Sequence, residues 1–265
     1  MLPFFDKRFG VRSFSVHIQL HPMGIGCALA EALHHLGNKV IISGRRKERL
    51  DETIQANPGM SAVELNVQDP ASIEMVAKKL IKDFPNMNVL INNAGIIQPD
   101  DAAGVIDEDV LISTVQTNLL GPIRLTSALI VHLKSKEEAI VINTTSILGF
   151  VPLAATAIYS ATKAALHTYT LSQRYMLKDT SVKVIEIVPP WVQSNNDEPR
   201  AMPLSSFIDE TIKVLGTDTD EVLVEEAKIY RNNPGPNEGV FVTHLNDTMN
   251  SDGNKFLSFD KSYSR

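Results

Sequence analysis

Short runs of apolar, often β-branched residues alternate with longer segments of helical periodicity through most of the chain. Apolar runs of about four to eight residues between turn signals are typical of strands, and the longer periodic segments are typical of helices. Because the runs are apolar almost throughout, we expect both faces of the sheet to be covered. The expected strands are Phe14–Gln19, Lys39–Ser43, Ala62–Asn66, Val89–Asn92, Ala139–Asn143 and Val182–Val188.

The segments between these strands are long enough to serve as the right-handed crossovers of a parallel sheet. The expected helices are Ile25–Leu36, Lys47–Ala56, Ala71–Phe84, Val110–Leu133 and Ala157–Leu177. This alternation predicts an α/β fold, a doubly wound, Rossmann-like and mostly parallel sheet with helices on both faces, in a single domain over residues 1–245. The first strand is the least regular of the set because His17 interrupts it.

The pattern loosens after Val188 into a proline-containing loop, followed by helices from about Ser205 and over about Asp220 to Tyr230. Long insertions after the last strands of such a sheet often cover the ligand crevice, so we expect a lid over about residues 189–218. Residues 246–265 are rich in Ser, Asn, Asp and Lys and show no sustained periodicity, which predicts a disordered tail.

Composition and charge narrow the possible partners. The chain has 265 residues and a net charge of −6, and its basic residues are scattered apart from Arg45-Arg46-Lys47. We therefore expect no nucleic-acid binding and a small molecule as the ligand. The histidines lack metal-ligand spacing, so no metal site is expected. A single cysteine, the lack of a long apolar run and the lack of a signal-like amino terminus predict a cytoplasmic protein with no membrane segment.

The most informative chemistry lies in Tyr159-Ser160-Ala161-Thr162-Lys163, with Ser146 thirteen residues before Tyr159 at the end of an expected strand. Residues four apart share one face of a helix, where an ammonium group can stabilise a phenolate. Lowering the pKa of a tyrosine from about 10 by about three units takes roughly 4 kcal/mol and would make it an effective acid and base. Taken alone, such a pair is common on helix surfaces.

In combination with other segments, this pair resembles the short-chain dehydrogenase/reductase family, whose Tyr-x-x-x-Lys hallmark corresponds to Tyr159 and Lys163. Asn92-Asn93-Ala94-Gly95 resembles the family's Asn-Asn-Ala-Gly segment, which lies beside the adenosine ribose of the cofactor. The order and spacing of the motifs agree from about Gly24 to about Val224, which is most of the chain.

The resemblance implies a catalytic set. Tyr159 would be the general acid and base, and Ser146 would bind the substrate oxygen. Lys163 would lower the pKa of Tyr159 and contact the nicotinamide ribose, while Asn118 would hold a water molecule in the proton relay. Val192 and Ser194 lie in a segment similar to the one that contacts the nicotinamide carboxamide. Each residue also has a purely structural reading, since asparagines can end a strand, a serine can cap a helix and a buried asparagine can serve only as a hydrogen-bonding group.

The cofactor loop agrees only in part with the family pattern Thr-Gly-x-x-x-Gly-x-Gly. Gly24-Ile25-Gly26 fits the end of that pattern, where glycines permit a tight turn and helix amides face a pyrophosphate. Gln19-Leu20 replaces the opening Thr-Gly, and Pro22 has no N–H group to offer a phosphate. We therefore expect this loop to limit cofactor affinity.

Arg45 follows the second strand, where a basic residue suits the extra phosphate of NADP(H), so NADP(H) is favoured over NAD(H). A solvated surface position is the alternative for this arginine. Asn66 and Val67 are expected near the adenine, and Asn93, Ala94 and Gly95 near the ribose. Glycine at position 95 would allow a close approach of the backbone.

The sequence thus predicts an NADP(H)-dependent oxidoreductase that interconverts a carbonyl and a secondary alcohol on a small, largely apolar substrate. Ile96, Ile97, Gln98, the segment from Ile147 to Val151 and Trp191 would form the apolar wall of its site. The resemblance also implies a homodimer or homotetramer packed through the two longest helices. The alternative is a catalytically silent binding or regulatory protein on the same fold, which the altered cofactor loop would favour.

Overall fold

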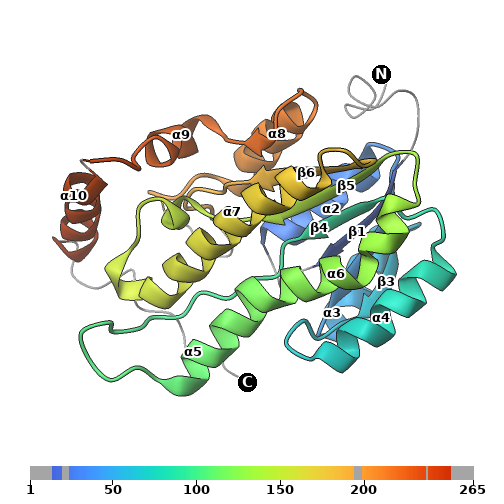
Figure 1. Cartoon of the computed structure of the whole chain (residues 1–265), viewed down its shortest axis with the longest axis horizontal. Helices are drawn as coiled ribbons and strands as arrows, with labels where there is room; N and C mark the ends of the chain where they lie inside the picture. Colours follow the sequence, from blue (N-terminus) through green and yellow to red (C-terminus); the bar gives the residue numbers. More distant parts are fainter. Residues whose placement is uncertain (1–13, 20–23, 194–198, 237, 252–265) are drawn as a thin grey trace.

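The strands form one seven-stranded sheet in the order β3-β2-β1-β4-β5-β6-β7, and every neighbouring pair is parallel. The computed structural model describes residues 14–19, 24–193, 199–236 and 238–251 (Figure 1). β1 (Ser15–Gln19) pairs with both β2 and β4, so the predicted first strand is confirmed. The other strands are β2 (Lys39–Gly44), β3 (Ser61–Glu64), β4 (Val89–Asn92), β5 (Ala139–Thr144), β6 (Val182–Ile187) and β7 (Glu221–Val222).

His17 does not disrupt β1, because the neighbouring strand supplies it with a partner. Its side chain is fully buried, and its Nε2 lies 2.9 Å from the hydroxyl oxygen of Ser43 on β2. Burial lowers the pKa of His17 to about 4, so the ring is neutral at pH 7 and behaves as a hydrogen-bonded core residue.

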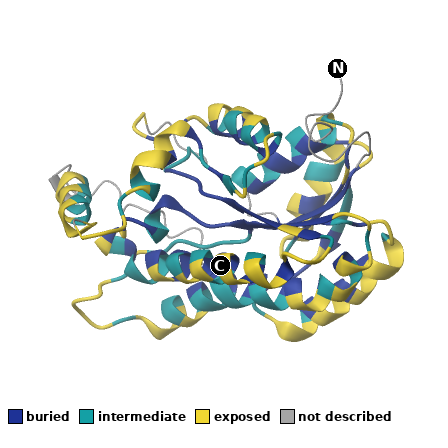
Figure 2. Ribbon diagram, turned by 45° about the horizontal axis from the view of Figure 1, so that its top comes forward, coloured by how far each residue is buried: buried dark blue, intermediate teal, exposed yellow. Residues whose placement is uncertain are grey.

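Helices cover both faces of the sheet, and Figure 2 shows the buried strands between the two helical layers. One layer contains α2 (Ile25–His35), α3 (Lys47–Ala56) and α8 (Leu204–Leu215). The other contains α4 (Pro70–Asp83), α6 (Gly121–Lys134) and α7 (Ala157–Leu177). Each layer packs its own hydrophobic cluster against the sheet. The predicted doubly wound fold is therefore confirmed.

The helix expected over Val110–Leu133 is confirmed, because residues 108–134 are helical throughout, but it contains a π-helical turn that the sequence did not predict. α5 (Glu108–Val115) leads into a π-helical turn, Gln116–Leu120, and α6 begins at Gly121. Pro122 has no N–H group for a continuous α-helical ladder, which favours a change of hydrogen-bond pattern at this point. Such π-helical turns often mark functional sites, and this one contains Asn118.

The region after β6 also differs from the expectation. In place of a helix from Asp220 to Tyr230, the structure has β7 followed by α9 (Glu225–Arg231). Glu221 and Val222 add to the open edge of the sheet beside Glu186 and Ile187, so pairing with β6 overrides the local helical pattern.

The disordered tail expected from residue 246 is wrong for residues 246–251, because they belong to α10 (Glu238–Ser251). α10 stands at one end of the molecule (Figure 1). The side chain of Asn246 accepts a hydrogen bond from the Ala154 amide (2.6 Å) and donates one to the Pro152 carbonyl (3.0 Å). The apolar spacing of Phe241, Val242 and Leu245 was concealed by the polar composition. Residues 252–265 lie outside the described part.

α8 forms the second half of the expected lid, but it packs against α2 and buries Phe207 and Leu215, so this part belongs to the core. Within the described ranges, no helix has both the length and the apolar character needed to cross a bilayer.

Candidate active site

The predicted site residues gather at one edge of the sheet, where the parallel strands β1, β4, β5 and β6 end. The strand order reverses between β1 and β4, because β2 and β3 lie on one side and β5 to β7 on the other. Sheets of this type bind their ligands in the crevice beyond such a reversal.

α7 carries the tyrosine and the lysine, and its first turn is held by a residue that the sequence analysis missed. Asp100, in the loop after β4, accepts hydrogen bonds from the amides of Ala157 (3.1 Å) and Ile158 (2.9 Å), one through each carboxylate oxygen. A carboxylate at this position satisfies unpaired helix amides and complements the helix dipole. Asp100 is far from α7 in sequence, so no local capping signal could reveal it.

Tyr159 lies beside Ser146, to which its hydroxyl group is hydrogen-bonded. Burial raises the pKa of Tyr159 to about 12, and the hydrogen bond with Ser146 opposes this effect only in part. The lowered tyrosine pKa that we expected from Lys163 is therefore not produced by the described chain itself. The reason is geometric, since Lys163 Nζ lies 5.6 Å from the centre of the Tyr159 ring and donates its hydrogen bond elsewhere.

Lys163 is only 3% exposed, and its Nζ donates to the carbonyl oxygen of Thr144 at 2.8 Å. Burial lowers the pKa of Lys163 to about 8, and the carboxylate of Glu186 acts in the opposite direction. The ammonium group is thus fixed at the last residue of β5, two residues before Ser146. Ser146 also caps a short 3-10 turn, accepting a hydrogen bond from the Leu148 amide at 3.2 Å.

Asn118 is completely buried in the π-helical turn. Its side-chain oxygen accepts from the Ile96 amide and its side-chain nitrogen donates to the Ile96 carbonyl, both at 2.8 Å, with a third bond to Thr162 Oγ1 at 3.2 Å. Asn118 therefore has the structural role considered from the sequence, that of a buried hydrogen-bonding group. A Cβ placed on Gly95 would lie 3.6 Å from Asn118 Oδ1 and 3.5 Å from Lys163 Nζ, which places all three residues together.

The expected nucleotide end lies where β1 meets α2. α2 begins at Ile25, directly after Gly24, so its first amides face the carboxyl end of β1. Gly26 packs so tightly that a Cβ would lie 2.4 Å from Asn93 Nδ2 and 3.0 Å from the Gln19 carbonyl oxygen. Only glycine permits this approach of helix and strand. Leu20 and Pro22 lie outside the described residues.

Gln19 is a second residue whose role the sequence analysis missed. Its Nε2 donates to Asn92 Oδ1 (2.9 Å), and its Oε1 accepts from the Ala94 amide (3.3 Å). The side chain of Asn93 donates to the Gln19 carbonyl at 3.2 Å. Gln19 thereby holds the start of the Asn92–Gly95 segment. Asn92 continues the network across the sheet by donating to Asn143 Oδ1 at 2.9 Å.

The remaining cofactor candidates lie at neighbouring strand ends. Arg45 follows β2 directly, and its side chain is exposed. Asn66 follows β3 and closes a turn by accepting from the Gln68 amide at 3.2 Å. Val67 is buried against Gly121. Val192 bridges to Met202 in the loop after β6, whereas Ser194 lies outside the described residues.

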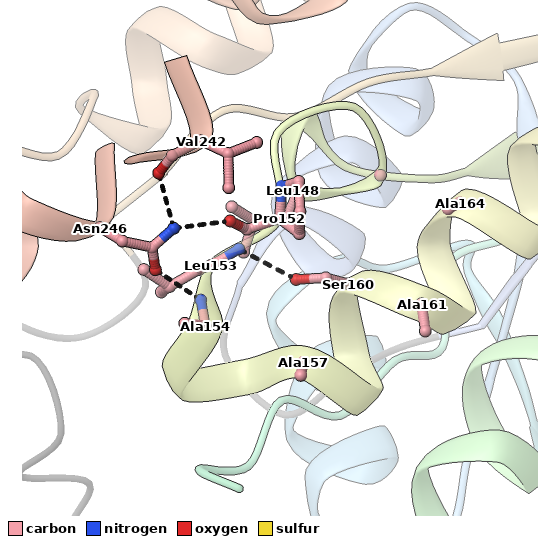
Figure 3. A pocket seen from close by; sticks show the side chains of 11 residues that line it. Leu148, Pro152, Leu153, Ala154, Ala157, Ser160, Ala161, Ala164, Val242 and Asn246 are labelled. Atoms are coloured by element: carbon pink, nitrogen blue, oxygen red, sulfur yellow. Dashed lines mark hydrogen bonds between the residues drawn. The ribbon is translucent and has the colours of Figure 1, made fainter. Parts of the chain in front are cut away.

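The predicted apolar wall is only partly available to a ligand. Ile147, Phe150 and Val151 belong to the hydrophobic core, whereas Leu148 and the segment from Ile96 to Gln98 are half-buried. Beside this wall lies a cavity of about 430 Å³, bounded by α7, α10 and the loop before α7 (Figure 3). It opens on the face of α7 that carries Ala157, Ala161 and Ala164, so it contains neither Tyr159 nor Ser146 and is not the reaction site.

Comparison with known proteins identifies the family of the chain. Residues 22–202 match a family model described as short chain dehydrogenase. The uncharacterized oxidoreductase DltE of Bacillus subtilis is 41% identical over 172 residues, which cover 64% of this chain and 68% of that protein. The NADP-dependent 3-hydroxy acid dehydrogenase YdfG of Escherichia coli is 32% identical over 170 residues, covering 63% of this chain and 67% of that protein.

Solved structures agree in fold. A short chain dehydrogenase from Burkholderia cenocepacia in complex with NADP superposes with a TM-score of 0.76 at 25% identity, over 88% of this chain and 98% of that one. Because the matched family model spans more than half of the chain and includes the Tyr159–Lys163 pair, the protein belongs to the short-chain dehydrogenase/reductase family, whose members are oxidoreductases that bind nicotinamide cofactors.

Proposed function

We propose that this protein is an NADP(H)-dependent oxidoreductase that interconverts a carbonyl and a secondary alcohol, with Tyr159 as the general acid and base. The observation that carries the proposal is a group of three side chains at the end of β5, in which Ser146 and Lys163 are buried and Tyr159 is half-buried. The Tyr159 hydroxyl is hydrogen-bonded to Ser146, and the ammonium group of Lys163 is held on the Thr144 carbonyl nearby.

In the reducing direction, the substrate oxygen would accept hydrogen bonds from Ser146 and Tyr159, and Tyr159 would donate its proton to that oxygen. The nicotinamide, when bound, supplies the hydride in reduction and accepts it in oxidation. A tyrosine pKa of about 12 keeps the hydroxyl protonated at pH 7, which suits a proton donor. Lys163 would stabilise the phenolate that remains, because it brings a positive charge to the same enclosed site.

The residues at the sheet edge fit a dinucleotide. At Gly95 the chain would tolerate a Cβ, because the nearest atoms would lie 3.5 Å or more away, so glycine there suits an additional group close to the backbone. The hydroxyl of Thr144 is buried and has no partner among the described residues, which leaves a polar group for a ligand. Arg45 is exposed directly after β2, where it would pair with a 2′-phosphate.

The substrate proposed is a small ketone or secondary alcohol with an apolar body, because Ile96, Ile97 and Leu148 of the predicted apolar wall are partly exposed. The 32% sequence identity to an NADP-dependent 3-hydroxy acid dehydrogenase supports testing 3-hydroxy acids and 3-oxo acids first as substrates.

We also propose that the protein acts in the cytoplasm as a homodimer or homotetramer. Val131 on α6 and Met176 on α7 are 79% and 77% exposed, and Tyr175 adds a large aromatic surface on the same helix. Contiguous exposed apolar side chains mark contact surfaces, so the proposal requires that Val131, Tyr175 and Met176 contribute to one apolar patch. Size-exclusion chromatography with light scattering would detect an assembly, and a monomer at micromolar concentration would contradict this part of the proposal.

The experiment for the activity has two steps. NADPH is titrated into the purified protein while its nicotinamide fluorescence is followed, and the consumption of NADPH is then measured with a panel of 3-oxo acids and aliphatic ketones. We expect binding and substrate-dependent oxidation of NADPH. If NADPH binds but is oxidised with none of the compounds in the panel, the proposed reaction is contradicted.

A further inference from the structure

Behind the candidate site lies a buried carboxylate that the proposed reaction does not use. Glu186 on β6 is 0% exposed. Thr145, the residue before Ser146, donates its hydroxyl hydrogen bond to Glu186 at 2.6 Å. The ring nitrogen Nδ1 of His167 on α7 lies 2.9 Å from both carboxylate oxygens. Glu186 therefore contacts both the segment that carries Ser146 and the helix that carries Tyr159.

Burying a carboxylate costs free energy, because the group loses its hydration. Hydrogen bonds offset this loss only in part. The charged and titratable groups that face it come from three elements. They are Lys163 and His167 from α7, Glu221 from β7 and Arg231 from α9.

Arg231 is already paired. Its guanidinium group binds both carboxylate oxygens of Glu221 at 2.9 to 3.1 Å, and both side chains are partly exposed. Two-point pairing of this kind is strong and directional. Lys163 differs, because its hydrogen bond goes to a backbone carbonyl and its charge has no carboxylate in direct contact among the described residues. Lys163 lies one helical turn before His167 on α7, and His167 contacts Glu186, so the charge of Glu186 lies beside the helix face that carries Lys163 and acts on its ammonium group.

We propose that Glu186 is a positioning residue of the site, the buried counter-charge that keeps the Lys163 ammonium group protonated. Burial outweighs the opposing charge of Glu186 and lowers the pKa of Lys163 to about 8, so without Glu186 the ammonium form would be lost closer to neutral pH. A negative charge in the same enclosed region acts against that loss, and it acts strongly because little water screens it.

The same cluster also meets a distance criterion for a metal site, since His167, Glu186 and Glu221 offer ligand atoms within 4.8 Å of one another. The two-point pairing of Arg231 with Glu221 argues against that use. A divalent cation would have to displace the guanidinium group and remain beside its positive charge. The network is therefore better described as charge compensation within the chain.

The consequence for turnover rests on the proposed function. The stabilising ammonium form of Lys163 is fully present below its pKa and is lost as the pH rises through it. Removing the charge of Glu186 lowers that pKa, so the alkaline limb of the pH–rate profile should move to lower pH. A residue that merely filled space would change the rate or the stability without moving this limb.

The direct test follows the ionisation of Lys163 without cofactor or substrate. In protein labelled with 13C at the lysine Cε positions, the Lys163 signal is assigned by its loss in Lys163→Met and titrated by NMR. The midpoint should fall by about one pH unit or more in Glu186→Gln, because one nearby opposite charge is removed. The matched control is Glu221→Gln, which removes the neighbouring carboxylate that Arg231 neutralises and should leave the midpoint unchanged.

An unchanged Lys163 midpoint in folded Glu186→Gln, or an equal fall in Glu221→Gln, would overturn the proposal. If Glu186→Gln does not fold, Glu186→Asp decides the matter, because it keeps the charge and withdraws it by one methylene group. A smaller fall is then expected, and no fall would overturn the proposal. Since the titration needs no turnover, a lowered midpoint in a protein that reduces no carbonyl would contradict the proposed function and leave the counter-charge role standing.

Discussion

The two ends of the candidate site are built differently. At the catalytic end, Ser146, Tyr159 and Lys163 match the family pattern, and two neighbouring elements, the end of β5 and α7, position all three. At the nucleotide end, the sequence before Gly24 departs from the pattern, yet the Gln19 side chain holds Asn92 and Ala94. The comparison teaches that the residues of a motif can differ from the family pattern while other side chains still connect the ends of the neighbouring strands. The following predictions test whether this difference separates catalysis from cofactor binding.

The largest expected effect belongs to the catalytic end. Tyr159→Phe deletes only the hydroxyl group that would transfer the proton, and general acid–base groups contribute about 10²- to 10⁴-fold to rate. We expect kcat to fall by about that factor while the Kd for NADPH changes little. Steady-state kinetics and a fluorescence titration check this. A variant that keeps more than about a tenth of the wild-type kcat would show that Tyr159 is not the acid.

A smaller effect, on binding rather than turnover, is expected from Gln19→Ala. It leaves the buried Asn92 side chain and the Ala94 amide without their partner, and each such loss costs about 1–3 kcal/mol. The Kd for NADPH should rise about 10- to 100-fold, and kcat at saturating NADPH should change little. The control is Gln173→Ala, which removes another buried glutamine, bonded to Asn143 on the same network. Equal effects of the two variants on Kd would make the role of Gln19 one of general stability.

Arg45→Ala should change the choice of cofactor. Charge-assisted hydrogen bonds to a phosphate contribute roughly 1.5–3 kcal/mol, so the preference for NADPH over NADH should fall about tenfold or more. Arg46→Ala is the matched control, because Arg46 is adjacent and also exposed. Both Kd values are measured for each variant. If the ratio is the same in Arg45→Ala and wild type, Arg45 is a solvated surface residue, the alternative considered from the sequence.

The smallest effect is a gain. Leu20→Gly combined with Pro22→Ser restores a flexible residue and an amide donor to the loop before Gly24. Gln19 is retained, because its side chain is part of the nucleotide end. The double variant should bind NADPH about tenfold more tightly. If wild type already binds at low micromolar Kd and the variant no better, the altered loop does not limit affinity.

Sequence reasoning identified what is local and failed where contacts join distant segments. Tyr159 and Lys163 are one helical turn apart, and Gly24 and Gly26 begin a helix after a strand, so local spacing together with the family motifs indicated them. Asp100 and Glu186 act on α7 from other elements, and their partners become neighbours only in the folded chain. The periodicity of residues 116–120 predicted a helix, but it could not distinguish π-helical from α-helical geometry.

The central claim is that Tyr159 donates a proton while the bound nicotinamide donates a hydride. The most direct measurement is deuterium transfer from NADPH labelled at the reactive C4 position to a 3-oxo acid or ketone, detected by mass spectrometry of the alcohol product. Wild type should place one deuterium on the former carbonyl carbon, and Tyr159→Phe should bind NADPH but transfer deuterium at least about a hundredfold more slowly. Transfer at the wild-type rate in Tyr159→Phe, or the lack of any deuterated alcohol from wild type with NADPH bound, would contradict the account.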